Sequence, residues 1–317
     1  MSFDLSNIKV GVLAGGVSSE RDISLQSGAQ VCRTLDSRGV EAVFIDITSR
    51  DDVVIKAQLK LHAPDVVFIA LHGEFGEDGS IQGILESIDI PYSGSGPVAS
   101  RLAMDKIASK EVFAKKRIPI APSCMLARGQ VMSTMVRYPV VVKPYCAGSS
   151  IGVSIVRDDM SLRQAIDVAF RVQDKLLIEQ YIEGRELTVG IFKEEPLAVV
   201  EIVPRGGYFD FTTKYSDGLA DLIAPAKLKQ AVYRAVQKTA VAAHRSLGCR
   251  HFSRVDIRLS PDEVPYVLEV NSIPGLTSHS LLPLSAAACG ISFNELIMEM
   301  IRAAFYGKNQ IQEVKKS

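Results

Sequence analysis

The hydrophobic and polar positions of the first 90 residues predict strands and helices in alternation. Residues 8–14 are apolar apart from Lys9 and predict a buried strand that a Gly-Gly turn follows, and residues 19–38 carry apolar positions at helical spacing. The predicted apolar stripe of this helix consists of Leu25, Ala29, Cys32 and Leu35. Apolar runs at 42–47 and 66–71 predict two further strands with a helical stretch between them. Strands that alternate with helices are typical of a parallel sheet covered by helices.

A run of small residues at 92–97 interrupts this pattern and predicts the first domain boundary. The elements expected beyond it are a helix over 98–117, strands at 138–144, 153–156 and 175–179 around a helix at 161–170, a loop at 204–225, a long helix at 227–247 and a last helix at 293–304, followed by a frayed polar tail. We therefore predict three domains, over residues 1–96, 97–180 and 181–317.

Residues 254–275 contain two segments of strict period-two alternation joined by the turn-forming sequence Ser-Pro-Asp-Glu. On the second segment, Val267, Glu269 and Asn271 are expected to share one face. Residues that oppose each other on paired strands share a face, so a register that pairs Asp256 with position 267 or 269 places it beside this face. Two carboxylates and an amide suit Mg²⁺ or Mn²⁺. The residues alone leave open a second interpretation, an acidic face that points to solvent.

The overall composition excludes several classes of partner. Lys plus Arg and Asp plus Glu both total 36, so no net charge favours nucleic acid or an anionic membrane. The five cysteines are odd in number and lack a Cys-x-x-Cys pair, which indicates neither a disulfide framework nor a zinc site and fits a reducing compartment. No signal peptide and no apolar run of membrane-spanning length is evident. We expect a soluble cytoplasmic protein.

Two features of the central region predict a nucleotide site. Lys143 follows three valines and precedes a proline, which places it at a sheet edge where a phosphate could bind. The loop 148–152, Gly-Ser-Ser-Ile-Gly, can present backbone N–H groups to an anion. Residues 177–184 pass from strand to turn and can offer backbone groups to a base, while Glu186 accepts hydrogen bonds from ribose. The alternative is a solvated lysine and a surface carboxylate.

Two residues of the first domain are candidates for substrate contact. Glu20 stands at a helix N-terminus, where the helix dipole alone accounts for a carboxylate, but it can also face the cleft and bind a substrate ammonium group. His72 lies on a glycine-rich loop after the third strand, at the cleft edge. A histidine in such a place is either a hydrogen-bonded structural residue or a functional one.

Several segments occur together in an order that carries a resemblance to a known family. The matching segments are residues 14–21 (Ala-Gly-Gly-Val-Ser-Ser-Glu-Arg), 70–79 (Ala-Leu-His-Gly-Glu-Phe-Gly-Glu-Asp-Gly), 91–97 (Pro-Tyr-Ser-Gly-Ser-Gly-Pro), 104–106 (Met-Asp-Lys), 142–144 (Val-Lys-Pro), 148–152, Lys214 with Tyr215, and 269–283. Over nearly its whole length the chain resembles the D-alanine:D-alanine ligases of the ATP-grasp superfamily. The resemblance implies an α/β fold, α+β in its C-terminal part, with three-domain ATP-grasp architecture and an N-terminal Rossmann-like parallel-sheet domain.

The resemblance implies an enzyme that uses ATP to phosphorylate one D-alanine, whose acyl phosphate the amine of a second D-alanine attacks, for peptidoglycan synthesis. The residues it assigns to ATP are Lys106, Lys143, Ser150, Glu179, Gln180, Tyr181, Ile182, Glu186 and Lys214. Asp256, Glu269 and Asn271 would hold two Mg²⁺ or Mn²⁺ ions. The residues it assigns to the substrates and the reaction are Glu20 for the first D-alanine, His72 for substrate binding, Ser149 and Tyr215 for loop closure, Arg254 and Gly275 for the oxyanion, and Ser280 and Leu281 for the second D-alanine. A homodimer is also implied.

The chain departs from the family pattern at Tyr145-Cys-Ala147, where polar or charged residues are common. Tyr215 favours a dipeptide product, since relatives that join D-alanine to D-lactate tend to replace this residue. Two alternatives stay open: another carboxylate–amine ligation of the same class, and a nucleotide-dependent binding or regulatory protein that performs no ligation. The presence of Arg254, Asp256, Glu269 and Asn271 argues against the second.

Overall fold

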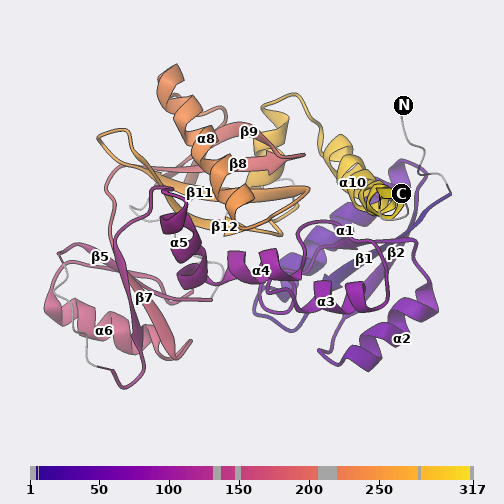
Figure 1. Cartoon of the computed structure of the whole chain (residues 1–317), viewed down its shortest axis with the longest axis horizontal. Coiled ribbons are helices and arrows are strands. Elements are labelled where there is room, and N and C mark those ends of the chain that lie inside the picture. Colours follow the sequence, from indigo (N-terminus) through magenta and orange to yellow (C-terminus); the bar gives the residue numbers. More distant parts are fainter. Residues whose placement is uncertain are drawn as a thin grey trace.

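The computed structural model of the chain describes residues 5, 7–130, 137–146, 151–205, 220–277 and 280–314, with side chains of the last helix described as far as Tyr306. Figure 1 shows three sheets, each with helices packed on it, that form three lobes of an elongated molecule. The mixture of one parallel and two antiparallel sheets confirms the predicted α/β class, with α+β structure in the C-terminal part.

The N-terminal sheet has the strand order β2-β1-β3 and is parallel, as the alternating pattern predicts. Its strands are β1 (Lys9–Gly15), β2 (Glu41–Ile47) and β3 (Val66–Ile69), and its helices are α1 (Arg21–Ser37), α2 (Asp52–His62) and α3 (Ser80–Ser87). Helix α1 packs on one face of the sheet, whereas α2 and α3 pack on the other. Because the three strands are parallel, their carboxyl ends lie at the same edge of the sheet, which is where ligands of such sheets bind.

The buried face of α1 differs from the predicted stripe. Leu35 is buried, but Leu25, Ala29 and Cys32 are only half-buried. The face on the sheet instead carries the small residues Ser24, Ser27 and Gly28. A Cβ on Gly28 would lie 2.5 Å from the Cβ of Ala14 in β1, so helix and strand approach too closely for larger side chains. The apolar residues of α1 did not mark its whole buried face, because the close approach of helix and strand requires small side chains there.

The single helix predicted over 98–117 is two helices, α4 (Pro97–Met104) and α5 (Lys106–Lys115). Asp105 separates them. Its carboxylate accepts hydrogen bonds from the N–H groups of Ile107 and Ala108, both at 2.9 Å, and thereby caps α5. The cap starts a new helix at Lys106, and Lys110 follows one turn later on the same side of it.

The small antiparallel sheet has the order β4-β7-β5-β6. Its strands are β4 (Ser123–Ala127), β5 (Val140–Pro144), β6 (Ser154–Val156) and β7 (Lys175–Gln180), with helix α6 (Asp159–Ala169) packed against it. The block predicted from the pattern is confirmed, and β4 is an addition that the pattern did not predict. In the antiparallel pairing of β5 with β7, Val141 opposes Glu179 and Lys143 opposes Leu177, so the side chains of Lys143 and Glu179 lie diagonally on the same face of the sheet.

The large antiparallel sheet has the order β10-β9-β8-β11-β12, with the long helix α8 (Gln230–Ser246) packed on it. Its strands are β8 (Arg185–Phe192), β9 (Glu195–Pro204), β10 (Ala220–Ile223), β11 (Phe252–Leu259) and β12 (Pro265–Asn271). The prediction of an unbroken loop over 204–225 was wrong, because β10 lies within it and pairs with β9. Strands β11 and β12 are the predicted hairpin.

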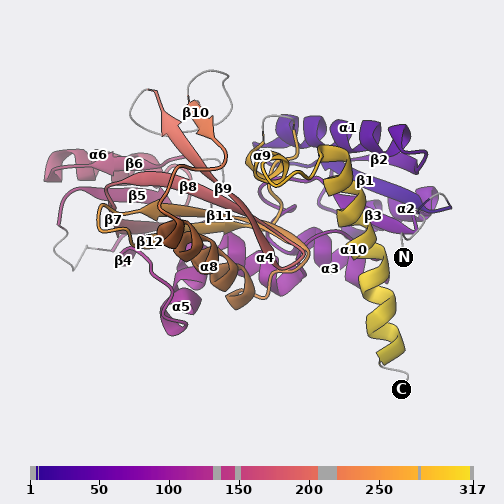
Figure 2. The same ribbon diagram turned by 90° about the horizontal axis from the view of Figure 1, so that it is seen from above.

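The end of the chain returns to the N-terminal lobe. Helix α9 (Leu281–Ala287) leads to α10 (Phe293–Val314), which lies beside α1 and the parallel sheet in Figure 2. Leu296, Ile297 and Ile301 of α10 share a core with β1 and β3. The helix is longer than predicted and continues to Val314, into the segment expected to fray. The division into domains at 96/97 and 180/181 stays a prediction. No helix in the described parts of the chain is long and apolar enough to cross a membrane.

Candidate active site

The register of the β11–β12 hairpin places Asp256 directly opposite Glu269, and Arg254 opposite Asn271. The predicted juxtaposition of these groups is therefore confirmed. The strict alternation predicted for the second strand was wrong, because a bulge after Asp256 pairs Ile257 with Val267, and Val267 is fully buried in the core. The bulge leaves Asp256 and Glu269 opposite each other on one face and turns the side chain of Val267 to the other face, into the core.

Three neighbouring side chains fix the carboxylate of Asp256 through four hydrogen bonds. Arg254 donates to both of its oxygens at 2.9 Å, Thr188 of β8 donates to Oδ1 at 2.7 Å, and the Asn271 amide donates to Oδ2 at 3.2 Å. Only 8% of the Asp256 surface is exposed. A bidentate arginine and two further donors hold the carboxylate in one orientation at the surface of the sheet.

Glu269 is paired with a lysine from the helix that Asp105 begins. Lys106 Nζ lies 2.9 Å from Glu269 Oε2, and the lysine is buried. Burial alone would lower the pKa of Lys106, but the Glu269 carboxylate outweighs it and raises that pKa above its usual value. Lys106 therefore stays an ammonium ion. The two carboxylates and their two cationic partners, Lys106 and Arg254, balance in charge.

The residues at this place suit a hard divalent cation. Among the described residues no group of three His, Cys, Asp or Glu side chains gathers as metal ligands. The candidate set has two carboxylates, Asp256 and Glu269, that oppose each other across one strand pair, and its third donor is the amide of Asn271. An all-oxygen set of this kind matches the preference of Mg²⁺ and Mn²⁺, which keep part of their coordination for water and substrate phosphates.

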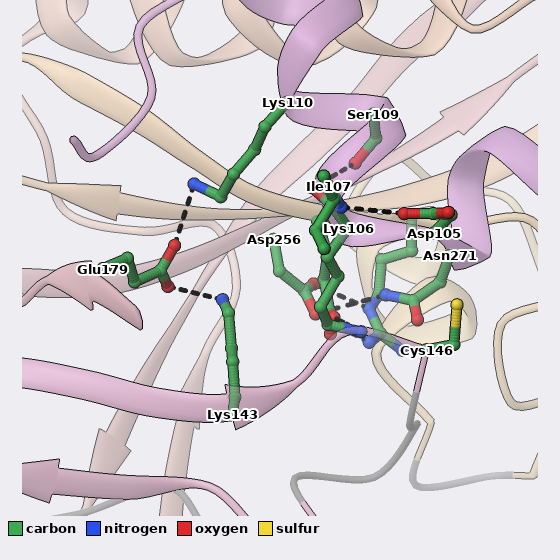
Figure 3. Close-up of polar contacts among 12 residues, drawn as sticks. Asp105, Lys106, Ile107, Ser109, Lys110, Lys143, Cys146, Glu179, Asp256 and Asn271 are labelled. Carbon is green, nitrogen blue, oxygen red and sulfur yellow. Dashed lines mark hydrogen bonds and ion pairs between the residues drawn. The ribbon is translucent and has the colours of Figure 1, made fainter. Parts of the chain in front are cut away.

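A second cluster joins the small sheet to α5 (Figure 3). Lys143 of β5 and Lys110 of α5 reach the carboxylate of Glu179 from opposite sides, Lys143 in a direct contact with Oε1 and Lys110 at 2.8 Å from Oε2. All three residues are buried. Burial would raise the pKa of Glu179, but the two ammonium groups hold it below its usual value, whereas burial lowers the pKa of Lys110. Two cations that share one carboxylate make this region attractive to an anion.

The segment between β7 and β8 connects the small sheet to the large one. Gln180 and Tyr181 both bond to the carbonyl of Pro139, through the Gln180 side-chain amide at 2.9 Å and the Tyr181 N–H at 3.1 Å. Arg258 of β11 binds the segment from the other side, with donors to the Ile182 carbonyl and to the Glu186 carboxylate. The residues assigned to the nucleoside thus lie on a short, half-buried connection that both sheets hold.

Glu20 and His72 meet at the edge of the N-terminal sheet. A Cβ on Gly73 would lie 2.5 Å from Glu20 Oε2, so the glutamate side chain lies over the loop that carries His72. The His72 ring bonds to Ser27 Oγ at 3.0 Å and to the Ile273 carbonyl at 3.1 Å. Ile273 follows Asn271 by two residues, so His72 contacts the stretch of chain that carries Glu269 and Asn271.

The residues that follow include Gly275, assigned by resemblance to the oxyanion, and Ser280 and Leu281, assigned to the second substrate. A Cβ on Gly275 would lie 2.9 Å from Ser280 Oγ, which leaves the hydroxyl against the glycine backbone. Ser280 Oγ accepts the Thr277 N–H at 2.9 Å, and Leu281 is the first residue of α9. The helix N-terminus beside these groups favours negative charge.

Four of the predicted site residues lie outside the described residues: Ser149, Ser150, Lys214 and Tyr215. The sequence interpretation missed Lys110, Thr188 and Arg258. Lys110 follows Lys106 at helical spacing, and Arg258 continues the alternation of Arg254 and Asp256, so both lie on a predictable face. Thr188 carried no local signal, because its role depends on the pairing of β8 with β11.

Comparisons with known proteins agree with this arrangement. A family model described as "D-ala D-ala ligase C-terminus" matches residues 112–302, and one described as "D-ala D-ala ligase N-terminus" matches residues 9–60 and 50–95. The chain is 46% identical over 301 residues to a D-alanine--D-alanine ligase of Citrifermentans bemidjiense, with 95% of this chain and 97% of the relative covered. A relative of that name from Geotalea uraniireducens is 46% identical over 304 residues, with the same coverage of both chains.

Solved structures resemble the fold over the same extent. The D-alanine--D-alanine ligase of Bacillus anthracis complexed with ATP matches with a TM-score of 0.84 and 33% identity, over 96% of this chain and 99% of that one. The D-alanine-D-alanine ligase of Coxiella burnetii matches with a TM-score of 0.83 and 25% identity, over 98% and 97%. The fold and the site therefore define an ATP-grasp enzyme. Within that class, the chain belongs to the D-alanine--D-alanine ligase family of ATP-dependent ligases.

Proposed function

We propose that this enzyme joins two molecules of D-alanine into D-alanyl-D-alanine at the expense of ATP, as its relatives are named for doing. The observation that carries the proposal is the opposed pair Asp256 and Glu269, which lies beside Lys106 in a protein of this family. Phosphoryl transfer needs positive charge around the phosphates and a fixed in-line geometry, and buried lysines next to an oriented acidic pair supply both.

Lys143 and Lys106 are the proposed phosphate-binding residues, and Ser150 and Lys214 complete the set by family resemblance. Glu179 holds Lys143 in place, while Gln180, Tyr181 and Ile182 would contact the base and Glu186 would contact the ribose. Asp256, Glu269 and Asn271 would hold two Mg²⁺ or Mn²⁺ ions. Such ions, when bound, neutralise charge on the transferring phosphoryl group.

Glu20 is proposed to bind the ammonium group of the first D-alanine, and His72 fixes the loop beside it. Ser280 and the N–H of Leu281 would receive the carboxylate of the second, where the start of α9 favours an anion. Arg254 and the Gly275 N–H would stabilise the tetrahedral oxyanion, with Ser149 and Tyr215 linking the loops that shield the acyl phosphate from water. Tyr215 supports the dipeptide over a D-lactate ester as product.

The wider setting follows from the family. We propose a cytoplasmic homodimer that serves peptidoglycan precursor synthesis, with domains over residues 1–96, 97–180 and 181–317. Sedimentation of the purified protein tests the dimer, and a monomer at micromolar concentration would contradict it.

The test of the activity is ADP release that requires both D-alanine and Mg²⁺, with the dipeptide identified by mass spectrometry. D-Lactate, D-serine and L-alanine offered as second substrates separate this activity from other carboxylate–amine ligations. ADP formation without any dipeptide, or a product only with another acceptor, would contradict the proposal.

A further inference from the structure

Arg258 lies on the same face of the large sheet as the acidic pair. Strand β11 pairs with β8 in an unbroken register in which Asp256 opposes Thr188 and Arg258 opposes Glu186. Residues two apart on a strand point to the same face, about 7 Å from each other. The guanidinium therefore lies next to Glu186. It is two residues along β11 from Asp256, which is proposed to hold the metal ions, on the side of the β7–β8 connection.

The three nitrogens of Arg258 bind three different groups of that connection. Nε donates to the Ile182 carbonyl at 2.9 Å, Nη1 to Glu186 Oε2 at 3.0 Å, and Nη2 to the Tyr181 hydroxyl at 2.6 Å. The guanidinium carbon also lies 5.2 Å from the centroid of the Tyr181 ring. Because the guanidinium is planar and rigid, it fixes the carbonyl, the carboxylate and the ring relative to one another.

The burial of this cluster makes the contacts stronger than those of a surface ion pair. The side chains of Arg258 and Glu186 are only 15% and 19% exposed. The connection between the sheets is also tight at Gly184, whose φ is +121° and where a Cβ would lie 2.0 Å from the Leu259 carbonyl. Gly184 thus allows the backbone to pack against the end of β11. Arg258 fixes the orientation of Tyr181 and Ile182 before this glycine and of Glu186 after it.

We propose that Arg258 is the positioning residue of the nucleoside site: it orients the Glu186 carboxylate toward the ribose hydroxyls and holds Tyr181 and Ile182 in place for the base. The inference rests on the proposed function only in placing the ATP nucleoside at this connection. Arg258 also balances the charge of Glu186, whose carboxylate would otherwise repel the triphosphate. With its charge balanced by Arg258, the Glu186 carboxylate can bind the ribose hydroxyls without repelling the triphosphate.

The test compares Arg258→Met, which keeps the length of the side chain but removes its charge and donors, with Arg258→Lys, which keeps only the charge. Arg185→Met is the matched control, since Arg185 precedes Glu186 but forms its own bidentate pair with Glu201, both bonds at 2.6 Å. The measurements are KM for ATP, KM for D-alanine, kcat, and the preference in kcat/KM for ATP over 2′-deoxy-ATP. Calorimetric binding of ATP without D-alanine is measured for each variant.

Because Arg258→Met removes hydrogen bonds to a carboxylate, a carbonyl and a hydroxyl at once, we expect it to raise KM and Kd for ATP at least tenfold. The kcat and the KM for D-alanine should change less than threefold, and the preference for ATP over 2′-deoxy-ATP should largely disappear. Arg258→Lys should lie between wild type and Arg258→Met, and Arg185→Met should resemble wild type. If Arg258→Met does not fold, Arg258→Lys carries the same test of nucleotide preference.

A double-mutant comparison tests whether Arg258 acts through Glu186. In a Glu186→Gln background, Arg258→Met should cause no further loss of the ribose preference. An unchanged ATP affinity, an unchanged ribose preference, or a parallel loss for ATP and D-alanine would overturn the inference. If the wild type makes no dipeptide but binds ATP, and Arg258→Met weakens that binding, the proposed ligation fails while the inference about Arg258 stands.

Discussion

His72 Nδ1 donates a hydrogen bond to the carbonyl oxygen of Ile273, 3.1 Å away and 201 positions later in the chain. A carbonyl oxygen only accepts, so Nδ1 carries a proton, and Nε2 forms the second hydrogen bond of the ring with the Ser27 hydroxyl at 3.0 Å. One buried ring therefore joins α1, the loop after β3 and the segment after β12. This ring connects the N-terminal lobe to the stretch of chain that carries Glu269 and Asn271.

The first prediction concerns this connection. His72→Phe keeps the ring volume but leaves the Ser27 hydroxyl and the Ile273 carbonyl without their partner, at a cost of about 1–3 kcal/mol for each buried group. We expect a KM for D-alanine raised about tenfold or more, with the Kd for ATP unchanged. Ser27→Ala removes only one of the two bonds and should have a smaller effect. Equal D-alanine kinetics in wild type and His72→Phe would contradict the role of the ring.

The second prediction concerns the acidic pair. Glu269→Gln preserves shape but removes the charge that opposes Asp256, so Mn²⁺ affinity should fall at least tenfold and turnover about 100-fold, because phosphoryl transfer depends on metal charge by several kcal/mol. Mn²⁺ titration followed by electron paramagnetic resonance measures the binding directly. Glu195→Gln, at an exposed position of the same sheet, is the matched control. Near wild-type turnover of Glu269→Gln would refute the metal assignment.

The third prediction concerns the buried cluster of Glu179 with Lys110 and Lys143. Glu179→Gln leaves two buried ammonium groups without their shared carboxylate, which should lower the free energy of unfolding by about 3–5 kcal/mol. Adding Lys110→Met to this variant removes one of the two cations and should restore part of the loss. Urea unfolding of the three proteins at one pH measures both effects. The explanation fails if the double variant is less stable than Glu179→Gln.

The fourth prediction concerns the approach of Ser280 to Gly275. A methyl group at Gly275 would lie 2.9 Å from Ser280 Oγ and displace the hydroxyl, so Gly275→Ala should lower kcat/KM for D-alanine about tenfold or more while the protein stays folded. Gly83→Ala is the control: position 83 lies inside α3 with open space around it, and alanine there should stabilise the protein by about 0.5–1 kcal/mol. Unchanged kinetics in Gly275→Ala would show that Ser280 can move without consequence.

The fifth prediction concerns the effect of pH on stability. Burial, with a smaller contribution from the charge of Arg250, lowers the pKa of His251 from 6.5 to about 4. The pKa is depressed in the folded state, so the contribution of His251 to stability is fully present above pH 6.5 and is lost as the pH falls toward 4. Between pH 7.5 and pH 5 this amounts to about 2 kcal/mol.

His251→Asn is the appropriate comparison for that prediction, because asparagine tolerates the positive φ of 63° at this position and does not titrate. Urea unfolding at the two pH values should show that wild type loses about 2 kcal/mol more than the variant. A parallel pH dependence of the two proteins would show that His251 is protonated at its ordinary pKa.

Much of the fold was predictable because it depends on local periodicity. The alternation of apolar strands and helices over the first 90 residues predicted the parallel sheet. The period-two pattern around Asp256 left two pairings open, with position 267 or with position 269, and the structure has the second. Features that local pattern did not reveal were the break at Asp105, strands β4 and β10, and the bulge that buries Val267. Each depends on a cap or on pairing with a distant segment.

The sequence by itself determined the residue types of the site, their order, and the family that this order resembles, because these properties are carried by short motifs. Only the tertiary structure decided that α10 packs on the first sheet, that Lys110 and Lys143 share Glu179, and that Arg258 binds the segment between the two antiparallel sheets. These contacts join residues tens to hundreds of positions apart. The partners of a buried charged residue are set by how distant segments pack together, and the residues near it in the sequence do not reveal them.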